Sequence, residues 1–259
     1  MAKDMKGIAA SDGIGIAPAY LLVDPDLSYD KVKVDDTAAE YARVKKAFQD
    51  SIEELTQIKE NAKDRLGEEE LGVFDAHIAI LSDPEMLGQI KDNIENNHTG
   101  AEEAVDKVTT AFADMLAAMT DNAYMQERAA DVKDVAKRAM SHLLGKQLLN
   151  IAGINSPVVI VAHEITPSDT SQMDAKFVKG IVTDLGGRTS HAAIMSRTLR
   201  IPAIVGSNEI TTSVEHGQMM IVDGLNGDAI IDPSDDQVKE YEAKAEAFEA
   251  ERAEWAKLV

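Results

Sequence analysis

The hydrophobic and polar positions of the chain follow three successive patterns. Residues 1–30 contain short apolar pieces separated by the turn-forming sequences DGIG and DPD, which is typical of β-strands. Residues 33–145 instead repeat their apolar positions at intervals of three and four, which predicts amphipathic helices. In residues 148–232, apolar runs alternate with helix-capping segments, and residues 233–259 form one last, highly charged helix. The pattern therefore predicts a helical region inserted between two stretches of β-strand.

In the helical region, the spacing of the apolar positions predicts about four helices joined by short links. This is the pattern of an antiparallel bundle. Thr37 and Glu40 have the spacing of a capping box at the start of the first helix, and Gly67 is expected to end it. Thr99 and Glu102 repeat that spacing before a later helix. The apolar stripe of the first helix consists of Tyr41, Val44, Phe48, Ile52, Leu55, Ile58, Ala62 and Leu66.

The second stretch of strands predicts an α/β layer. PVVIVA, GIVTD and PAIVG are expected to be buried strands, and MMIVDGLNGDAII is expected to be a hairpin. The N-terminal strands find no partner in a helical bundle, so we expect them to pair with this later sheet. The predicted fold class is therefore a discontinuous α/β subdomain, residues 1–30 and 148–232, with an inserted antiparallel helical subdomain, residues 33–145. The apolar stripe of the C-terminal helix, residues 233–259, must pack back on the chain or meet a continuing polypeptide.

The charge and the cysteine content limit the class of protein. The chain has 46 acidic and 26 basic residues, a formal net charge of −20, and we therefore expect no nucleic-acid partner. It has no cysteine, which excludes disulfides, thiolate nucleophiles and cysteine metal sites. No apolar run is long enough to span a bilayer, and the N-terminus lacks the apolar core of a signal peptide. We expect a cytoplasmic protein without a membrane partner.

One of the six histidines differs from the others in its surroundings. His191 lies just inside the start of a predicted helix, where free N–H groups and the partial positive charge of the helix point to the ring. A double glycine allows close approach of the backbone, and an arginine adds a fixed positive charge. The other histidines show no metal-ligand spacing, so no metal site is expected. The residues of the predicted site are Gly186, Gly187, Arg188, Thr189, Ser190 and His191.

This combination predicts an anion site at which a histidine acts as a nucleophile. Phosphate is the commonest occupant of a glycine turn at a helix N-terminus. The positive surroundings disfavour the imidazolium form, and a neutral imidazole can attack a phosphoryl group. We therefore expect a phosphohistidine at His191. The motif is short, and spacing alone leaves open a structural histidine beside an ordinary helix start.

The sequence GGRTSHAAIMSR, followed by IPAIVG, resembles the phosphohistidine signature of enzymes that use phosphoenolpyruvate, including pyruvate phosphate dikinase and phosphoenolpyruvate synthase. Three further segments are similar to Enzyme I of the bacterial sugar phosphotransferase system: GIAASDGIGIAPAYLL, GEEELGVFDAHIAILSDPE and ERAADVKDVAKR. The helical insertion before the histidine is also similar to that family. This resemblance covers essentially the whole chain.

The resemblance implies that His191 is phosphorylated from phosphoenolpyruvate and passes the phosphoryl group reversibly to the carrier protein HPr. It implies a swivelling α/β subdomain for the histidine and a helical subdomain that binds HPr. Thr170, in TPSDT, matches a threonine that approaches the histidine in relatives. Residues 31–145 carry 14 basic and 24 acidic side chains, which suits a basic partner. The implied HPr-binding residues are Glu68, Asp75, His77, Ile80 and Arg128.

The chain departs from the family in two ways. Glu70 stands where some relatives have a lysine that can lie near the histidine. The phosphoenolpyruvate-binding half of the family, a dimerising β/α barrel with a magnesium site, has no counterpart here. We therefore expect a monomeric phosphotransfer domain that ends in a linker helix, needs no cofactor and exchanges phosphate only with HPr. Phosphoenolpyruvate, magnesium and homodimer formation are expected to belong to the full-length enzyme.

Two other functions remain open at this level. The first is the swivelling domain of a dikinase or synthase, although such an enzyme has no need of an inserted acidic bundle. The second is a helical interaction module without turnover, in which the histidine is only structural. Incubation with phosphorylated HPr distinguishes the three hypotheses.

Overall fold

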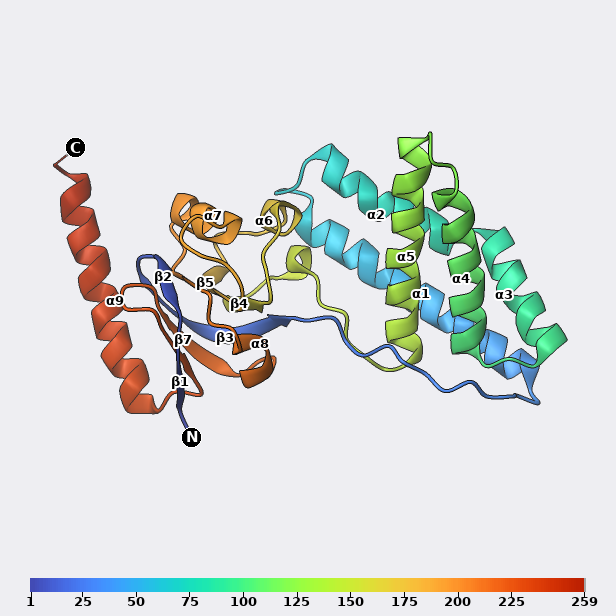
Figure 1. The fold of residues 1–259 in the computed structure, drawn as a ribbon, viewed down its shortest axis with the longest axis horizontal. Helices are drawn as coiled ribbons and strands as arrows, with labels where there is room; N and C mark the ends of the chain where they lie inside the picture. Colours follow the sequence, from blue (N-terminus) through green and yellow to red (C-terminus); the bar gives the residue numbers. More distant parts are fainter. Residues whose placement is uncertain (259) are drawn as a thin grey trace. The chain divides into compact units, whose positions relative to one another are not determined.

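The computed structural model describes the backbone of residues 1–258 and, apart from Ser168, their side chains (Figure 1). The chain forms two compact units. An α/β unit consists of Met1–Val23 and the chain from Leu149 onward, and a helical unit consists of Asp24–Leu148.

The α/β unit is built on one eight-stranded sheet with the order β1-β8-β7-β3-β4-β5-β6-β2. Neighbours from β3 to β6 are parallel, and the other pairs are antiparallel. The N-terminal strands pair with the later strands, as expected from the sequence. The strands are β1 (Lys3–Lys6), β2 (Ile8–Ser11), β3 (Ile14–Leu22), β4 (Val158–Ala162), β5 (Val178–Thr183), β6 (Ala203–Val205), β7 (Met219–Asp223) and β8 (Asp228–Ile231).

The two outermost strands of the sheet, β1 and β2, are consecutive in the chain, and only Gly7 separates them. The sheet therefore curls until its edges meet at this residue. The Gly7 N–H donates to the carbonyl of Gly227 at 2.9 Å. A Cβ on Gly7 would lie 2.5 Å from the side chain of Ile204, so glycine is needed for this approach.

The sheet is buried on both faces. Val159, Val161 and Val182 pack on one face together with Ile210 of the short helix α8 (Ile210–Ser213). The opposite face packs against α7 (His191–Leu199), and Figure 1 shows α6 (Pro167–Ser171) on the same side of β4 and β5 as α7. All five residues of β4 are buried, as in strands that are covered on both faces. The carboxyl ends of β4 and β5 lead into the segments that precede α6 and α7.

The helical unit contains five helices, where the sequence pattern predicted about four. Its helices are α1 (Thr37–Ala62), α2 (Glu68–Leu81), α3 (Pro84–Asn97), α4 (Ala101–Ala117) and α5 (Ala123–Leu143). The boundary with the α/β unit lies at Val23 and not at residue 30. Asp24 and Tyr29 explain this difference, because the Asp24 carboxylate pairs with Lys137 at 2.5 Å and the Tyr29 hydroxyl donates to Asp106 at 2.5 Å.

Both capping boxes expected in this unit are wrong. Helix α1 is capped by Asp36, whose carboxylate accepts from the N–H of Ala39 at 3.0 Å. Glu40 instead accepts from the N–H of Ala101, at the start of α4, at 2.6 Å. Helix α4 begins after Gly100, and the Thr99 hydroxyl donates to the Asn93 side chain at 2.8 Å. Glu40 of α1 therefore binds the start of α4, and Thr99 binds the end of α3.

The C-terminal helix α9 (Asp235–Ala256) packs along β3 within the α/β unit. A capping box between Ser234 and Gln237 fixes its start. Phe248 is partly buried, as is most of the apolar stripe that the sequence shows. Trp255, at the end of the stripe, is 65% exposed. The stripe therefore packs back on this chain over most of its length.

Candidate functional site

His191 is the first residue of α7. Ser190 caps this helix, because its Oγ accepts from the N–H of Ala193 at 3.3 Å and donates to the carbonyl of Gly187 at 2.7 Å. The N–H groups of His191 and Ala192 lie in the first turn, where a helix has no carbonyl partner for them. Together with the helix dipole they favour an anion beside the ring.

The Thr170 hydroxyl meets the imidazole of His191, although 21 residues separate them. Its Oγ1 lies 3.0 Å from the Nε2 of His191 and 2.8 Å from the carbonyl oxygen of Pro167. Thr170 belongs to α6, whose start is fixed by a capping box between Thr166 and Asp169. The structure therefore brings together the two residues that the resemblance had paired.

This contact allows two arrangements of protons. If the hydroxyl donates to the Nε2 of His191, that nitrogen carries its lone pair and the ring proton is on Nδ1. If the hydroxyl donates to the carbonyl of Pro167, Nε2–H donates to Oγ1 of Thr170. Rotation of the Thr170 hydroxyl from one acceptor to the other thus accompanies the change between a protonated Nε2 and an Nε2 with a free lone pair.

The segment before α7 uses its two glycines differently. Gly186 has a φ of +107°, and a Cβ there would lie 3.0 Å from the Oγ of Ser190. Gly187 has open space where a Cβ would be, so the space around it does not require a glycine at this position. Arg188 and Thr189 are exposed. The described cap hydrogen bond of α7 comes from Ser190 and not from Thr189.

Arg197 supports this segment from the last turn of α7, and sequence reasoning did not single it out. Its Nη2 donates to the carbonyl of Arg188 at 2.8 Å, and its Nη1 donates to the carbonyl of Ala10 in β2 at 2.8 Å. The guanidinium therefore connects the segment before His191 to the sheet. No sequence pattern indicates this role, because both acceptors are backbone carbonyls.

The five residues expected to bind HPr differ in their exposure. Glu68 and Asp75 are exposed on α2, and Arg128 on α5 is partly buried. His77 and Ile80 are 8% and 5% exposed, so they are buried in the helical unit and offer little contact area. Their assignment as HPr-binding residues stays a prediction. His77 Nε2 lies 3.1 Å from the Asp131 carboxylate, and Asp75 pairs with Lys59 at 2.6 Å.

A groove of about 520 Å³ lies between α2 and α5. Its lining includes Glu69, Glu70, Val73, Tyr124 and Arg128. Val73 and Tyr124 are large apolar side chains that are 45% and 61% exposed. An acidic rim with exposed apolar side chains suits a basic protein partner.

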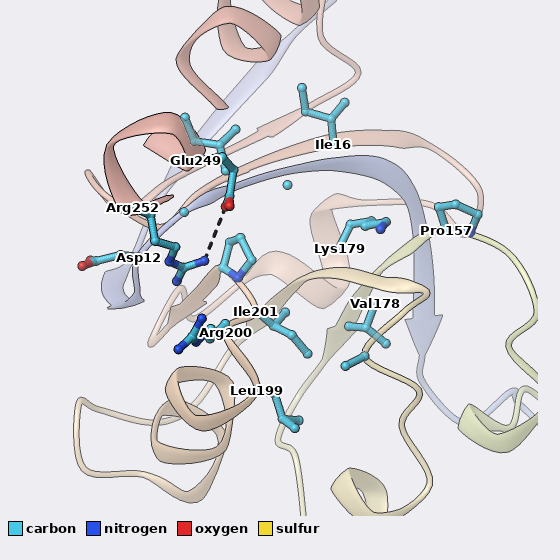
Figure 2. A pocket seen from close by; sticks show the side chains of 15 residues that line it. Asp12, Ile16, Pro157, Val178, Lys179, Leu199, Arg200, Ile201, Glu249 and Arg252 are labelled. Atoms are coloured by element: carbon cyan, nitrogen blue, oxygen red, sulfur yellow. Dashed lines mark hydrogen bonds and ion pairs between the residues drawn. The ribbon is translucent and has the colours of Figure 1, made fainter. Parts of the chain in front are cut away.

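A second pocket, of about 480 Å³, lies in the α/β unit between α9 and the sheet (Figure 2). Arg252 pairs there with Glu249 at 3.4 Å, and Lys179 and Arg200 also line it. Arg200 lies at the C-terminal end of α7, whereas His191 lies at the N-terminal end. Nine residues of helix span about 13 Å, so this pocket is separate from the candidate phosphoryl site.

Residues 1–258 offer neither a metal site nor a membrane-spanning helix. They contain no group of three histidine, aspartate or glutamate side chains arranged to hold a metal ion. None of their helices combines the length and the apolar character needed to cross a membrane.

Comparisons with known proteins identify the relatives of this chain. Residues 6–128 match the family model of the N-terminal part of PEP-utilising enzymes, and residues 154–227 match the model of their mobile domain. A phosphoenolpyruvate-protein phosphotransferase of Enterococcus faecalis is 56% identical over 258 residues. A counterpart of the same name from Listeria innocua is 53% identical. The alignments include all of this chain but only 45% of each relative, so the chain spans less than half the length of these proteins.

Two solved structures also match. An NMR solution structure of an Enzyme I protein is 38% identical with a TM-score of 0.69, covering 95% of this chain and 99% of that one. An N-terminal domain of the nitrogen form of Enzyme I is 26% identical with a TM-score of 0.59, covering 92% of this chain and 98% of that one.

The helical region, the sheet and the two family models define the class as the phosphoenolpyruvate-utilising enzymes. Within that class, the chain belongs to the Enzyme I family.

Proposed function

We propose that this chain is the phosphotransfer part of an Enzyme I. His191 receives a phosphoryl group, in the full-length enzyme from phosphoenolpyruvate, and passes it reversibly to HPr in the cytoplasm. The α/β unit acts as the swivelling phosphohistidine subdomain, and α9 links it to the half that binds phosphoenolpyruvate and magnesium and dimerises. The observation that supports this proposal most directly is the position of the His191 ring, at the start of α7 and 3.0 Å from the Thr170 hydroxyl.

The transfer needs no further reactant. The lone pair of His191 Nε2 attacks the phosphorus atom of phosphorylated HPr, and a new N–P bond forms as the bond to the donor nitrogen breaks. The attacking ring releases its remaining N–H proton, and the departing ring takes up one proton. Both proteins hold the phosphoryl group on imidazole, so the equilibrium lies near thermoneutrality.

The residues around His191 stabilise the transferred group by position and charge. First-turn N–H groups and the dipole of α7 point to the ring, and Arg188 adds an exposed positive charge. The Thr170 hydroxyl can turn from Nε2 to a phosphoryl oxygen after transfer. These groups favour the charge that develops as the phosphoryl group moves.

We expect Thr170→Val to slow transfer from phosphorylated HPr by about 10- to 100-fold, because a hydrogen bond to a charged group contributes about 1.5–3 kcal/mol. Valine keeps the shape of the side chain and removes the hydroxyl. Thr198→Val is a matched control, because the Thr198 hydroxyl donates to the carbonyl of Ile194 in its own helix and is exposed. Rapid-quench measurement of labelled His191 compares the two. Equal rates would remove Thr170 from the mechanism.

We propose that HPr binds the groove between α2 and α5. Replacing Glu68 or Asp75 by lysine should slow association several-fold at low salt, and the difference should shrink as salt rises, because exposed charges are screened over about 8 Å at physiological ionic strength. Asp92→Lys changes the net charge equally but lies on α3, and it is the control. Stopped-flow association at two salt concentrations measures the effect. A slowing as large for Asp92→Lys as for the α2 variants would contradict this binding site.

The buried position of Ile80 changes the choice of an apolar test residue. Truncating Ile80 is expected to destabilise the helical unit by about 2–5 kcal/mol, which would confuse a binding measurement. Val73 is exposed in the groove, and Val73→Ala should speed the dissociation of HPr while the melting temperature stays within a few degrees. An unchanged dissociation rate would place HPr elsewhere.

A further inference from the structure

The segments that carry Thr170 and His191 begin at neighbouring points of the sheet. Strand β4 ends at Ala162, and the chain continues through His163 into α6. Strand β5 ends at Thr183, and the chain continues through Asp184 toward α7. The two strands are parallel neighbours, and their last residues are partners in the register. His163 and Asp184 therefore occupy the same position, one residue beyond each strand.

The side chains of these two residues join the segments at this point. His163 Nδ1 lies 3.0 Å from Asp184 Oδ2. The Asp184 side chain is 4% exposed, whereas that of His163 is 68% exposed. The Asp184 carboxylate also accepts from the backbone N–H of Thr211 at 3.1 Å and from its hydroxyl at 2.5 Å. The buried carboxylate thus fixes the exposed ring to the sheet and to α8.

The charge state of Asp184 suits this role. Its burial disfavours the charged form, but the hydrogen bonds from Thr211 and His163 outweigh burial and lower the pKa of the carboxyl group. The carboxylate is therefore ionised and accepts hydrogen bonds only. In the contact, His163 supplies the proton on Nδ1.

Backbone hydrogen bonds make the same connection. The N–H of Asp184 donates to the carbonyl of Ala162 at 3.2 Å, and the N–H of Leu185 donates to the carbonyl of His163 at 3.0 Å. The carbonyl of Asp184 accepts from the N–H of Asn208 at 3.0 Å. A shift of either segment at this point would therefore be passed on to the other.

We propose that His163 and Asp184 form a positioning pair for phosphoryl transfer, which holds α6 and the segment before α7 together so that Thr170 meets the Nε2 of His191. This inference rests on the proposed function of His191. Neither residue of the pair touches the phosphoryl group, and both act through the Thr170–His191 contact.

The test uses the exposed member of the pair, because Asp184→Ala leaves the partly buried donors of Thr211 unpaired and can prevent folding. His163→Ala should lower the maximal rate of transfer from phosphorylated HPr about three- to tenfold, since small misplacements of reacting groups slow reactions strongly. The dissociation constant for HPr should not change. His163→Gln keeps an N–H donor and should recover most of the rate. His216→Ala, another exposed histidine of this unit, is the control with an unchanged rate.

A double-mutant cycle separates positioning from a general loss of stability. In a Thr170→Val background, His163→Ala should have almost no further effect, because the contact through which it acts is already gone. The inference would be overturned if His163→Ala slowed transfer by the same factor in both backgrounds. An undiminished rate in His163→Ala would also overturn it.

A third measurement does not depend on transfer. In the unphosphorylated protein, His163→Ala should shift the ring ¹⁵N resonances of His191, whereas His216→Ala should not. If the unaltered protein accepts no phosphoryl group, the proposed function fails and these ring spectra still decide the positioning role. If it accepts one and His163→Ala leaves both the rate and the ring resonances unchanged, the positioning role alone fails.

Discussion

Replacing His191 by alanine should abolish phosphorylation by phosphorylated HPr and leave the fold intact. The side chain is only partly buried, and Ser190 continues to cap α7 without the ring. The melting temperature should therefore change by no more than a few degrees, since surface substitutions usually alter stability by about 0.5 kcal/mol or less. Labelling should disappear, because the variant lacks the imidazole that meets the Thr170 hydroxyl.

The matched control for this loss is His216→Ala. His216 is an exposed histidine of the same unit, and its Nδ1 accepts from the N–H of Leu21 at 3.1 Å. This variant should take up the phosphoryl group like the unaltered protein. Undiminished labelling of His191→Ala would show that another residue is the acceptor.

The second large effect concerns the sheet. Gly15 lies in β3, and a Cβ there would be 1.9 Å from the carbonyl oxygen of Lys179 in β5. Backbone atoms of a central strand have no room to yield. Gly15→Ala should therefore destabilise the α/β unit by about 4 kcal/mol or more, a size reserved for severe packing defects. Denaturant unfolding, monitored by signals from residues of the α/β unit, measures this loss of unfolding free energy.

Gly72 provides the opposite control. It is exposed on α2, and nothing lies within 4 Å of the place where its Cβ would be. Gly72→Ala should stabilise the helical unit by about 0.5–1 kcal/mol, because glycine costs conformational entropy inside a helix. A Gly15→Ala protein as stable as the unaltered one would contradict the close approach of β3 to β5.

Short sequence patterns predicted those helices and strands that are determined by neighbouring residues in the chain. Apolar runs identified most strands, and the absence of a partner for the first strands led to their pairing with the later sheet. Strand β1 was not predicted, because KDMK is largely polar. It pairs with β8 through the backbone and through the ion pair between Lys6 and Asp228 at 2.5 Å. The capping boxes at Thr37 and Thr99 failed because Glu40 is used across helices, a choice that spacing cannot show.

The site shows the same limit. The position of His191 followed from a glycine turn and a helix start, both of which are short-range signals. The burial of His77 and Ile80 was missed because it depends on how α2 packs in the helical unit. Asp184 was missed because its partners, His163 and Thr211, come together only when the strands pair. Contacts between distant segments therefore needed the structure.

The central claim is that the Nε2 of His191 carries the phosphoryl group. The most direct test incubates the protein with phosphorylated HPr and then combines peptide mass spectrometry with ¹⁵N NMR of the histidine rings. We predict one added phosphoryl group, on the peptide that contains His191, with the bond at Nε2, and its removal by excess unphosphorylated HPr. Phosphoenolpyruvate and magnesium without HPr should add none. A phosphoryl group on another residue, or on Nδ1 of His191, would contradict the account.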